Sequence, residues 1–105
     1  MERGNCPCAD ECVLERALDM IGGKWKLRIL CSLSGHGASR YNELLRNIHG
    51  ISNTMLSKTL RELEDDGLVL RHEYLQVPVR VEYESTDQAR KLQPILLQLI
   101  RWAAN

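Results

Sequence analysis

The sequence lacks any long apolar segment. Its 105 residues contain no run of apolar residues that approaches the roughly 18 needed for a membrane-spanning helix. The first residues, Met-Glu-Arg-Gly-Asn-Cys, also lack the apolar core that a secretory signal peptide requires. These two absences argue against a membrane protein and against a secreted one. We therefore expect a cytoplasmic protein with no membrane partner.

An excess of charge of either sign is also missing. The chain has 14 Lys and Arg residues against 14 Asp and Glu residues, so its formal net charge is zero. A protein that coats nucleic acid without sequence preference would be strongly basic, which excludes that class. A specific DNA-binding protein that gathers its cations on one surface is still allowed. The positions of the charges therefore matter more than their sum.

Motifs of enzyme active sites are absent as well. We find no nucleophile elbow, no Gly-rich phosphate-binding loop and no His and Asp pair at catalytic spacing. A thiol reductase built on Cys6–Cys8 would need a surrounding βαβ pattern, which the sequence does not have. His36, His49 and His72 are scattered and have no metal-ligand spacing. We expect a protein that is not an enzyme and needs no cofactor.

The most informative segment that is present spans residues 51–67. Apolar residues recur there at i, i+4 and i+7, which predicts one apolar helical face. They are Leu56, Leu60 and Leu63, with Met55 beside them. Ser52 is a typical N-cap and Gly67 a typical helix stop. The segment therefore predicts an amphipathic helix with defined ends.

The opposite face of this helix is polar and carries no acid. Its residues are Asn53, Thr54, Ser57, Lys58 and Arg61. All the acids, from Glu62 to Asp66, gather at the C-terminal end. Such a face suits the DNA major groove, where amides, hydroxyls and cations read base edges. Taken alone, the segment fits an ordinary surface helix with a solvated face equally well.

The neighbouring segments favour the DNA interpretation. Helical spacing of apolar residues predicts helices at 12–21, 24–33 and 40–48, with a turn at 34–37. A short turn at His49 and Gly50 then makes the last two helices before residue 67 a helix-turn-helix.

After Gly67 the apolar period changes from 3.6 to 2. This change predicts strands at 68–74 and 79–84, joined at residues 75–78, where Pro78 suits a hairpin tip. A helix-turn-helix followed by such a hairpin is a winged helix. We therefore predict a mainly α fold with a small β-hairpin (α+β), a winged helix-turn-helix over residues 12–105. A flexible, cysteine-containing arm of residues 1–11 precedes it.

The last helix is expected to mediate dimerisation. Thr86 is a suitable N-cap, Asp87 suits the first turn, and we expect one helix over about 86–104 that Pro94 kinks. Its apolar residues occupy nearly every face, more than a small domain can bury, and the first helix adds to them. We therefore predict a homodimer built on the first and last helices; the alternative is a last helix deep in its own core. The expected interface residues are Leu14, Leu92, Leu96, Leu99 and Trp102.

Several motifs, in order from Cys12 to Thr86, resemble those of a known family. They are Cys-Val-Leu-Glu-Arg-Ala-Leu-Asp-Met-Ile-Gly-Gly-Lys-Trp at 12–25, Arg-Tyr-Asn-Glu-Leu at 40–44, Ile-Ser at 51–52, Met-Leu-Ser at 55–57, Leu-Arg-Glu-Leu-Glu-Asp-Asp-Gly-Leu-Val at 60–69 and Val-Pro-Val-Arg-Val-Glu-Tyr at 77–83. They resemble the HxlR-type (MarR-like) winged-helix transcriptional regulators. Two positions depart from the family pattern: Val13 replaces a usual proline, and Ala89 replaces a frequent glycine.

The resemblance implies a dimeric, DNA-binding regulator of bacterial type. It implies that the helix after Ile51 and Ser52 lies in the major groove and that the wing arginine, Arg80, reaches the backbone or minor groove. We expect the base-edge readers to be Ser52, Asn53, Thr54, Ser57, Lys58 and Arg61. The expected phosphate contacts are Arg40, Lys24, Lys26 and Arg80.

The expected function is a repressor that acts on double-stranded DNA. A two-fold dimer predicts a pseudo-palindromic operator whose half-sites lie about 10 base pairs apart, or a multiple of that spacing. The alternative functions are a winged helix that binds protein rather than DNA, and a metal-responsive regulator.

The N-terminal cysteines leave three interpretations open. A thiol at a helix N-terminus, such as Cys12, has a lowered pKa and suits a sensor of oxidants or small electrophiles. The resemblance adds to this, because some members of the family sense quinones, aldehydes or oxidants near this position. Alternatively Cys6, Cys8 and Cys12 share a metal ion, with Asp10 or a residue of the other subunit as fourth ligand. In the third interpretation all four cysteines are inert and Cys31 is a small core residue.

Overall fold

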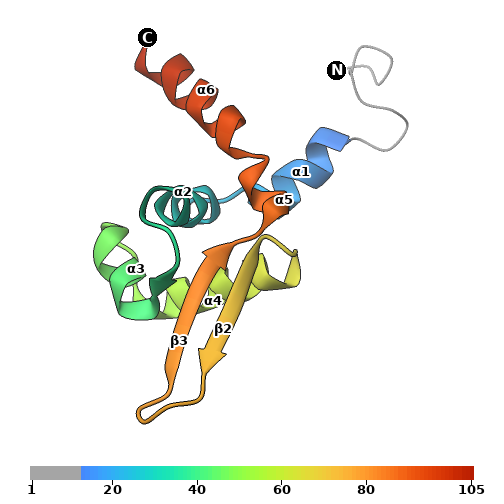
Figure 1. Ribbon diagram of the computed structural model, residues 1–105. Coiled ribbons are helices and arrows are strands. Elements are labelled where there is room, and N and C mark those ends of the chain that lie inside the picture. Colours follow the sequence, from blue (N-terminus) through green and yellow to red (C-terminus); the bar gives the residue numbers. More distant parts are fainter. Residues whose placement is uncertain (1–12) are drawn as a thin grey trace.

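The computed structural model describes residues 13–105 (Figure 1). The arm expected at residues 1–11 and the candidate sensor Cys12 lie outside the described residues. In chain order the elements are α1 (Val13–Ile21), α2 (Lys26–His36), β1 (Ser39–Arg40), α3 (Tyr41–Asn47), α4 (Asn53–Asp65), β2 (Val69–Tyr74), β3 (Arg80–Ser85), α5 (Asp87–Arg90) and α6 (Gln93–Ala104). The mainly α fold with a small antiparallel sheet is confirmed.

The core lies where α2, α3 and α4 meet the base of the hairpin. The predicted stripe of α4, Leu56, Leu60 and Leu63, is almost fully buried. The other largest buried side chains are Ile29, Leu30, Leu44 and Leu68. Each buried aliphatic side chain stabilises the fold by about 1.5–3 kcal/mol relative to its exposure to water. The core therefore holds α4 by one face and leaves the opposite face outside.

The helix α2 differs from its predicted bounds. It begins at Lys26 rather than at residue 24, and it continues to His36 through residues expected to form a turn. The helix ends at Gly37, whose φ of 79° lies in the left-handed region and whose N–H donates to the Leu33 carbonyl at 2.9 Å. Gly37 can adopt this conformation because it has no side chain. The glycine that stops the helix is thus Gly37, and Gly35 is tolerated inside it.

The hairpin of β2 and β3 forms the predicted wing. The two strands pair antiparallel from Val69 opposite Ser85 to Tyr74 opposite Arg80. A third strand, β1, pairs with β3 through Ser39 opposite Tyr83, so the strand order is β1-β3-β2. The strand β1 was not predicted, because two residues are too few to show an alternating pattern.

The prediction of a single kinked helix at residues 86–104 is wrong. α5 ends at Arg90, and a separate helix, α6, begins at Gln93 with Pro94 in its first turn. In an uninterrupted helix the Pro94 ring would clash with the Arg90 carbonyl, four residues earlier, and would leave it without a donor. A proline in the first turn loses no hydrogen bond, so the chain restarts the helix there.

The expected N-cap of α5 is confirmed. The Thr86 hydroxyl accepts the Ala89 N–H at 3.2 Å and donates to the Gly67 carbonyl at 2.8 Å. Gly67, with a φ of 74°, is itself the predicted stop after α4. One side chain therefore joins the exit from α4 to the entrance of α5.

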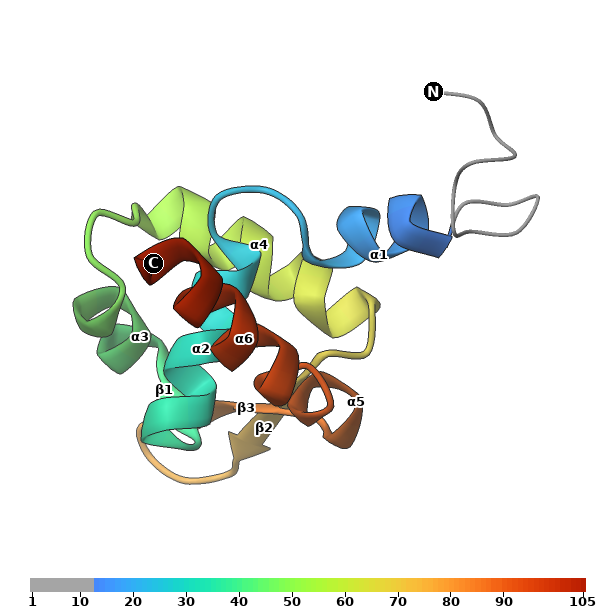
Figure 2. The same cartoon turned by 90° about the horizontal axis from the view of Figure 1, so that it is seen from above.

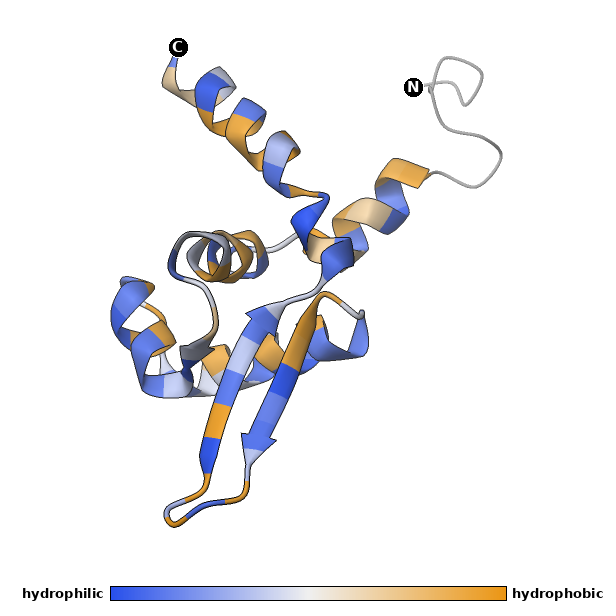
Figure 3. Cartoon of the chain, in the orientation of Figure 1, coloured by the Kyte–Doolittle hydropathy of each residue, from blue (hydrophilic) through white to orange (hydrophobic). Residues whose placement is uncertain are grey.

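α6 projects from the body of the molecule (Figure 1), and in the view from above it lies over α2 (Figure 2). None of its residues is buried, so the alternative of a last helix deep in its own core is wrong. Figure 3 shows hydrophobic residues, in orange, along both α6 and α1. Like α6, α1 has no buried residue. Of the residues predicted for the dimer interface, Leu14, Leu99 and Trp102 are exposed, whereas Leu92 and Leu96 are half-buried. None of the described helices is long and apolar enough to cross a membrane.

Candidate nucleic-acid interface

The polar face of α4 is the centre of the candidate interface. The Ser52 hydroxyl caps the helix by accepting the Met55 N–H at 3.1 Å, as the sequence predicted. The buried leucines fix the rotation of the helix about its axis, which turns the polar residues outward. The exposed residues are Ser52, Asn53, Thr54, Ser57, Lys58 and Arg61. The five-residue face and its cap are therefore accessible on one side of α4.

The two cations of this face have no acidic partner in the part of the chain that the structure describes. Within residues 13–105, neither Lys58 nor Arg61 has an ion pair or a side-chain hydrogen bond. No acid precedes Glu62 in the helix. Charges left unpaired on an exposed face are available to an anionic partner.

A residue outside α4 orders the start of this face. The Tyr41 hydroxyl, on the first residue of α3, lies 2.9 Å from the Asn53 carbonyl oxygen and 3.1 Å from Asn53 Oδ1. It also lies 3.0 Å from Ser57 Oγ. Tyr41 was not among the residues predicted for the site. A half-buried tyrosine usually needs a partner for its hydroxyl, and this was the available signal.

A residue of α2, Arg28, anchors the turn between α3 and α4. The Arg28 guanidinium donates to the His49 carbonyl at 2.9 Å. Arg28 and Lys24 each lie 4.8 Å from the centre of the Trp25 ring. These contacts fix the short turn of the helix-turn-helix and so fix how α4 leaves α3.

Lys24 and Lys26, expected at phosphates, do not lie with the polar face of α4. Lys26 Nζ donates to the Asp19 carbonyl at 3.1 Å, which ties α2 to α1. Both lysines line a cavity of about 270 Å³ together with Met55 and Glu62, on another side of α4. Lys26 bonds to Asp19 and Lys24 lies over the Trp25 ring, so they are the weakest of the predicted phosphate ligands.

Arg40 directly precedes Tyr41, whose hydroxyl contacts the start of α4. It is the N-cap residue of α3, and its backbone N–H donates to Glu43 Oε1 at 2.7 Å. Its side chain is exposed, and β1 pairs Arg40 with Glu82 of the wing. Arg40 thus lies at the junction between the helix-turn-helix and the wing.

The wing arginines are held by wing residues. Arg80 stacks on Tyr74, with the guanidinium carbon 4.1 Å from the ring centre, and its Nε lies 3.8 Å from Glu82 Oε2. Arg71, which was not among the predicted site residues, lies opposite Tyr83 in the hairpin. A hydrogen bond with the Tyr83 side chain raises the pKa of the Arg71 guanidinium above its usual value. Both wing cations are therefore oriented before any partner binds.

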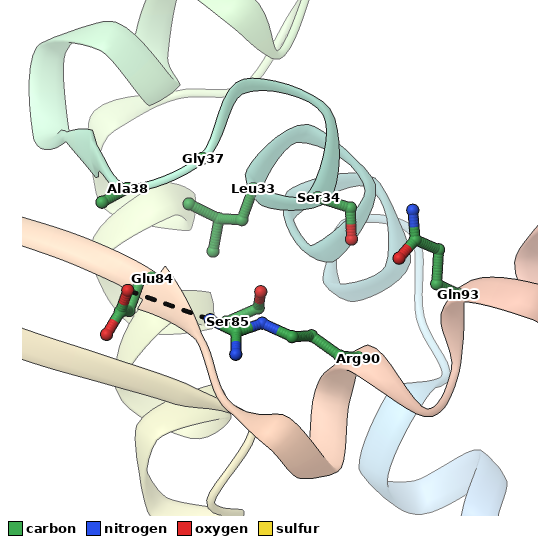
Figure 4. A pocket seen from close by; sticks show the side chains of 8 residues that line it. All are labelled: Leu33, Ser34, Gly37, Ala38, Glu84, Ser85, Arg90 and Gln93. Carbon is green, nitrogen blue, oxygen red and sulfur yellow. Dashed lines mark ion pairs between the residues drawn. The ribbon is translucent and has the colours of Figure 1, made fainter.

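A polar cavity of about 200 Å³ lies between the base of the wing and the start of α6 (Figure 4). Arg90 of α5 reaches across it to Glu84 of β3, at 4.0 Å, and also pairs with Asp87 at 2.8 Å. The same Glu84 accepts a 2.8 Å contact from His72 of β2. These contacts connect the wing to the segment that leads into α6.

Of the four cysteines, only Cys31 lies within the described residues. Cys6, Cys8 and Cys12 lie outside the described residues, and so does Asp10. Cys31 is an exposed free thiol on α2, so the expectation that it is a core residue is wrong. It follows the buried pair Ile29 and Leu30 and falls on the outer side of the helix. Among residues 13–105 no group of His, Cys, Asp or Glu could hold a metal ion.

A family model described as HxlR-like helix-turn-helix matches residues 20–105. The chain belongs to the HxlR-like helix-turn-helix family. It is 49% identical over 92 residues to the HTH-type transcriptional regulator YtcD of Bacillus subtilis (strain 168), covering 88% of this chain and 72% of YtcD. The resemblance read from the motifs is thereby confirmed.

Solved structures of transcriptional regulators superpose on the chain. The crystal structure of YtcD gives a TM-score of 0.86 at 46% identity, covering 90% of this chain and 96% of that one. The redox regulator HypR in its oxidized form gives 0.82 at 45% identity, with 90% and 97% covered. A MarR-family regulator from Porphyromonas gingivalis W83 gives 0.84 at 34% identity, with 92% and 94% covered. This HxlR-like protein is a DNA-binding transcriptional regulator with a MarR-like winged-helix fold, and not an enzyme.

Proposed function

We propose that this HxlR-like regulator is a cytoplasmic, homodimeric repressor that reads a pseudo-palindromic operator with the polar face of α4. The observation that carries the proposal is that face itself. It is exposed, carries unpaired Lys58 and Arg61 within the described chain, and is fixed by the buried leucines behind it. Amides, hydroxyls and cationic forks near the start of a helix are the groups that read base edges.

Phosphate contacts complete the proposed interface. Arg40 lies at the start of α3, and Arg71 and Arg80 lie on the wing that follows α4. Cations at such positions fix the register of the protein on the duplex without reading its sequence. Because the wing arginines are already oriented by Tyr83 and Tyr74, they lose little side-chain freedom on binding.

The homodimer is supported by the apolar surface of α1 and α6. α6 has 12 residues and buries none of them in its own chain, and Trp102 is 74% exposed. An apolar surface of this kind marks an interaction site. A second copy of the same helices would cover it in a two-fold arrangement. Leu14, Leu92, Leu96, Leu99 and Trp102 remain the proposed contacts.

A thiol switch is the second part of the proposal. Cys12 directly precedes α1, which begins at Val13 and belongs to the proposed dimer interface. Oxidation or addition of a small electrophile at this residue would therefore act next to the interface. HypR, 45% identical to this chain, is described as a redox regulator. Intact mass before and after diamide, with Cys12→Ser as control, tests whether Cys12 is the reacting thiol.

DNA binding by the α4 face is tested on DNA that flanks the protein's own gene. The double variant Asn53→Ala, Arg61→Ala is expected to lose the preference for operator over unrelated DNA while it keeps its fold and oligomeric state. Lys91→Ala, which removes an exposed cation beside α5, is the matched control and should bind as the parent does. A double variant that bound the operator as tightly as the parent would refute the proposal.

A further inference from the structure

The first turn of α4 is not an isolated set of side chains. Asn53 and Ser57 lie one helical turn apart, about 6 Å along the axis, and both contact the same hydroxyl of Tyr41. α3, which carries Tyr41, lies beside the N-terminal end of α4 (Figure 1). The orientation of two exposed readers is therefore set by a residue on another helix.

The Tyr41 hydroxyl has one proton, and this determines which atom donates in each of these contacts. A tyrosine hydroxyl donates one hydrogen bond and accepts others through its lone pairs. Both Asn53 atoms near it, the carbonyl oxygen at 2.9 Å and Oδ1 at 3.1 Å, can only accept. The single Tyr41 proton is thus shared between these two Asn53 oxygens in a bifurcated hydrogen bond. The Ser57 hydroxyl, 3.0 Å away, must then donate its own proton to the Tyr41 oxygen.

This direction fixes what each reader can offer to DNA. With Oδ1 engaged, Asn53 offers its Nδ2 donors to a partner. With its proton engaged, Ser57 offers only the lone pairs of Oγ. In the major groove, guanine O6 and thymine O4 are acceptors, whereas the amino groups of adenine and cytosine are donors. One residue would therefore favour a keto base and the other an amino base.

We infer that Tyr41 is a specificity-determining positioning residue, whose hydroxyl makes Asn53 a donor to a keto base and Ser57 an acceptor from an amino base. The inference rests on the proposed function, because it requires that the α4 face reads DNA. Tyr41 itself needs no contact with a base. It acts by removing the alternative hydrogen-bonding choices of its two neighbours.

The test compares base preferences from a randomised half-site library for the parent and Tyr41→Phe. The parent is expected to prefer guanine or thymine at the Asn53 position and adenine or cytosine at the Ser57 position. Loss of one neutral hydrogen bond corresponds to roughly a five-fold change, so Tyr41→Phe should lower each preference by about that factor. Adenine should gain most at the Asn53 position, since a released amide can pair with it through both atoms.

Thr59→Val is the matched control. Like Tyr41→Phe, it removes one hydroxyl, and it lies on α4 with Asn53 and Ser57. The Thr59 hydroxyl, however, donates to the Met55 carbonyl at 2.7 Å and is buried away from the polar face. This control should leave the base preferences unchanged. A purely structural role for Tyr41 would instead lower affinity for all sequences equally, together with the melting temperature, and would overturn the inference.

Asn53→Ala and Ser57→Ala separate this inference from the proposed function. If neither alanine variant changes the base preference, the α4 face is not the reader and the proposed function fails. If both change it and Tyr41→Phe does not, the inference about Tyr41 alone is wrong.

Discussion

Two helices of nearly equal length, α4 with 13 residues and α6 with 12, use their apolar residues in opposite ways. α4 buries four residues and packs against α2 and the hairpin, and its outer face is polar. α6 buries none and presents leucines, isoleucines and a tryptophan to solvent. The chain completes the environment of one amphipathic helix and leaves the other incomplete. α4 thus presents a face that suits a polar partner, and α6 requires an apolar one.

The largest expected effect separates the two helices by stability. Leu60→Ala in α4 removes a side chain that is 2% exposed, so it should lower the free energy of unfolding by about 2–5 kcal/mol. Urea unfolding at low protein concentration gives the value. Leu97→Ala, at a position 49% exposed in α6, is the comparison and should cost far less there. Equal losses for both variants would mean that α6 packs on its own chain.

Self-association, in contrast to stability, should depend on α6. Trp102→Asp places a charge in the proposed interface and should weaken self-association at least ten-fold, because burying an unpaired charge is costly. Sedimentation measures the change, and circular dichroism should show an unchanged helix content. Asp87→Asn, at an exposed acid of α5, is a control that should leave association as it is. A variant dimer as tight as the parent would place the interface elsewhere.

The N-cap of α4 gives a smaller effect. Ser52→Ala removes the acceptor of the Met55 N–H and should destabilise the protein by about 1 kcal/mol. Ser52→Gly should cost only a few tenths of that, since glycine also suits an N-cap. Thermal melting of the two variants side by side gives the difference. A Ser52→Ala variant as stable as the parent would show that the serine hydroxyl does not carry the cap.

The smallest expected effect concerns the unpaired cations. Lys58→Gln should reduce the slope of log affinity against log salt by about 0.9, the contribution of one neutralised phosphate. Fluorescence anisotropy over a salt series measures this slope. Lys26→Gln, whose parent amine bonds to the Asp19 carbonyl, should change it less. If Lys26→Gln has the larger effect, the phosphate contacts lie on the α1 side of α4.

The sequence was sufficient where local signals are strong. Ser52, the leucine stripe and Gly67 define α4 without further context, and the change of period with Pro78 defines the wing. It was insufficient where the outcome depends on packing. A two-residue strand has no pattern of its own, and Pro94 is compatible with either a kink or a new helix until the Arg90 carbonyl is considered.

The polar contacts of Tyr41 show the same limit at the candidate site. Its hydroxyl meets Asn53 and Ser57 only because the turn held by Arg28 sets two helices at a particular angle. No spacing along the chain encodes that angle. Exposed Cys31 was misjudged for a related reason, because a cysteine in an apolar helix does not reveal which side of the helix faces solvent.

The Thr86 side chain, which joins the Gly67 carbonyl to the first turn of α5, has a geometric consequence for the operator. In the proposed dimer the α6 helices determine where the two-fold axis lies, and the α4 helices determine where each half-site is read. The chain passes from one to the other through this joint and the wing. The distance between half-sites is then a property of the joint rather than of the reading face. Relatives with the same α4 residues and a different joint should prefer different operator spacings.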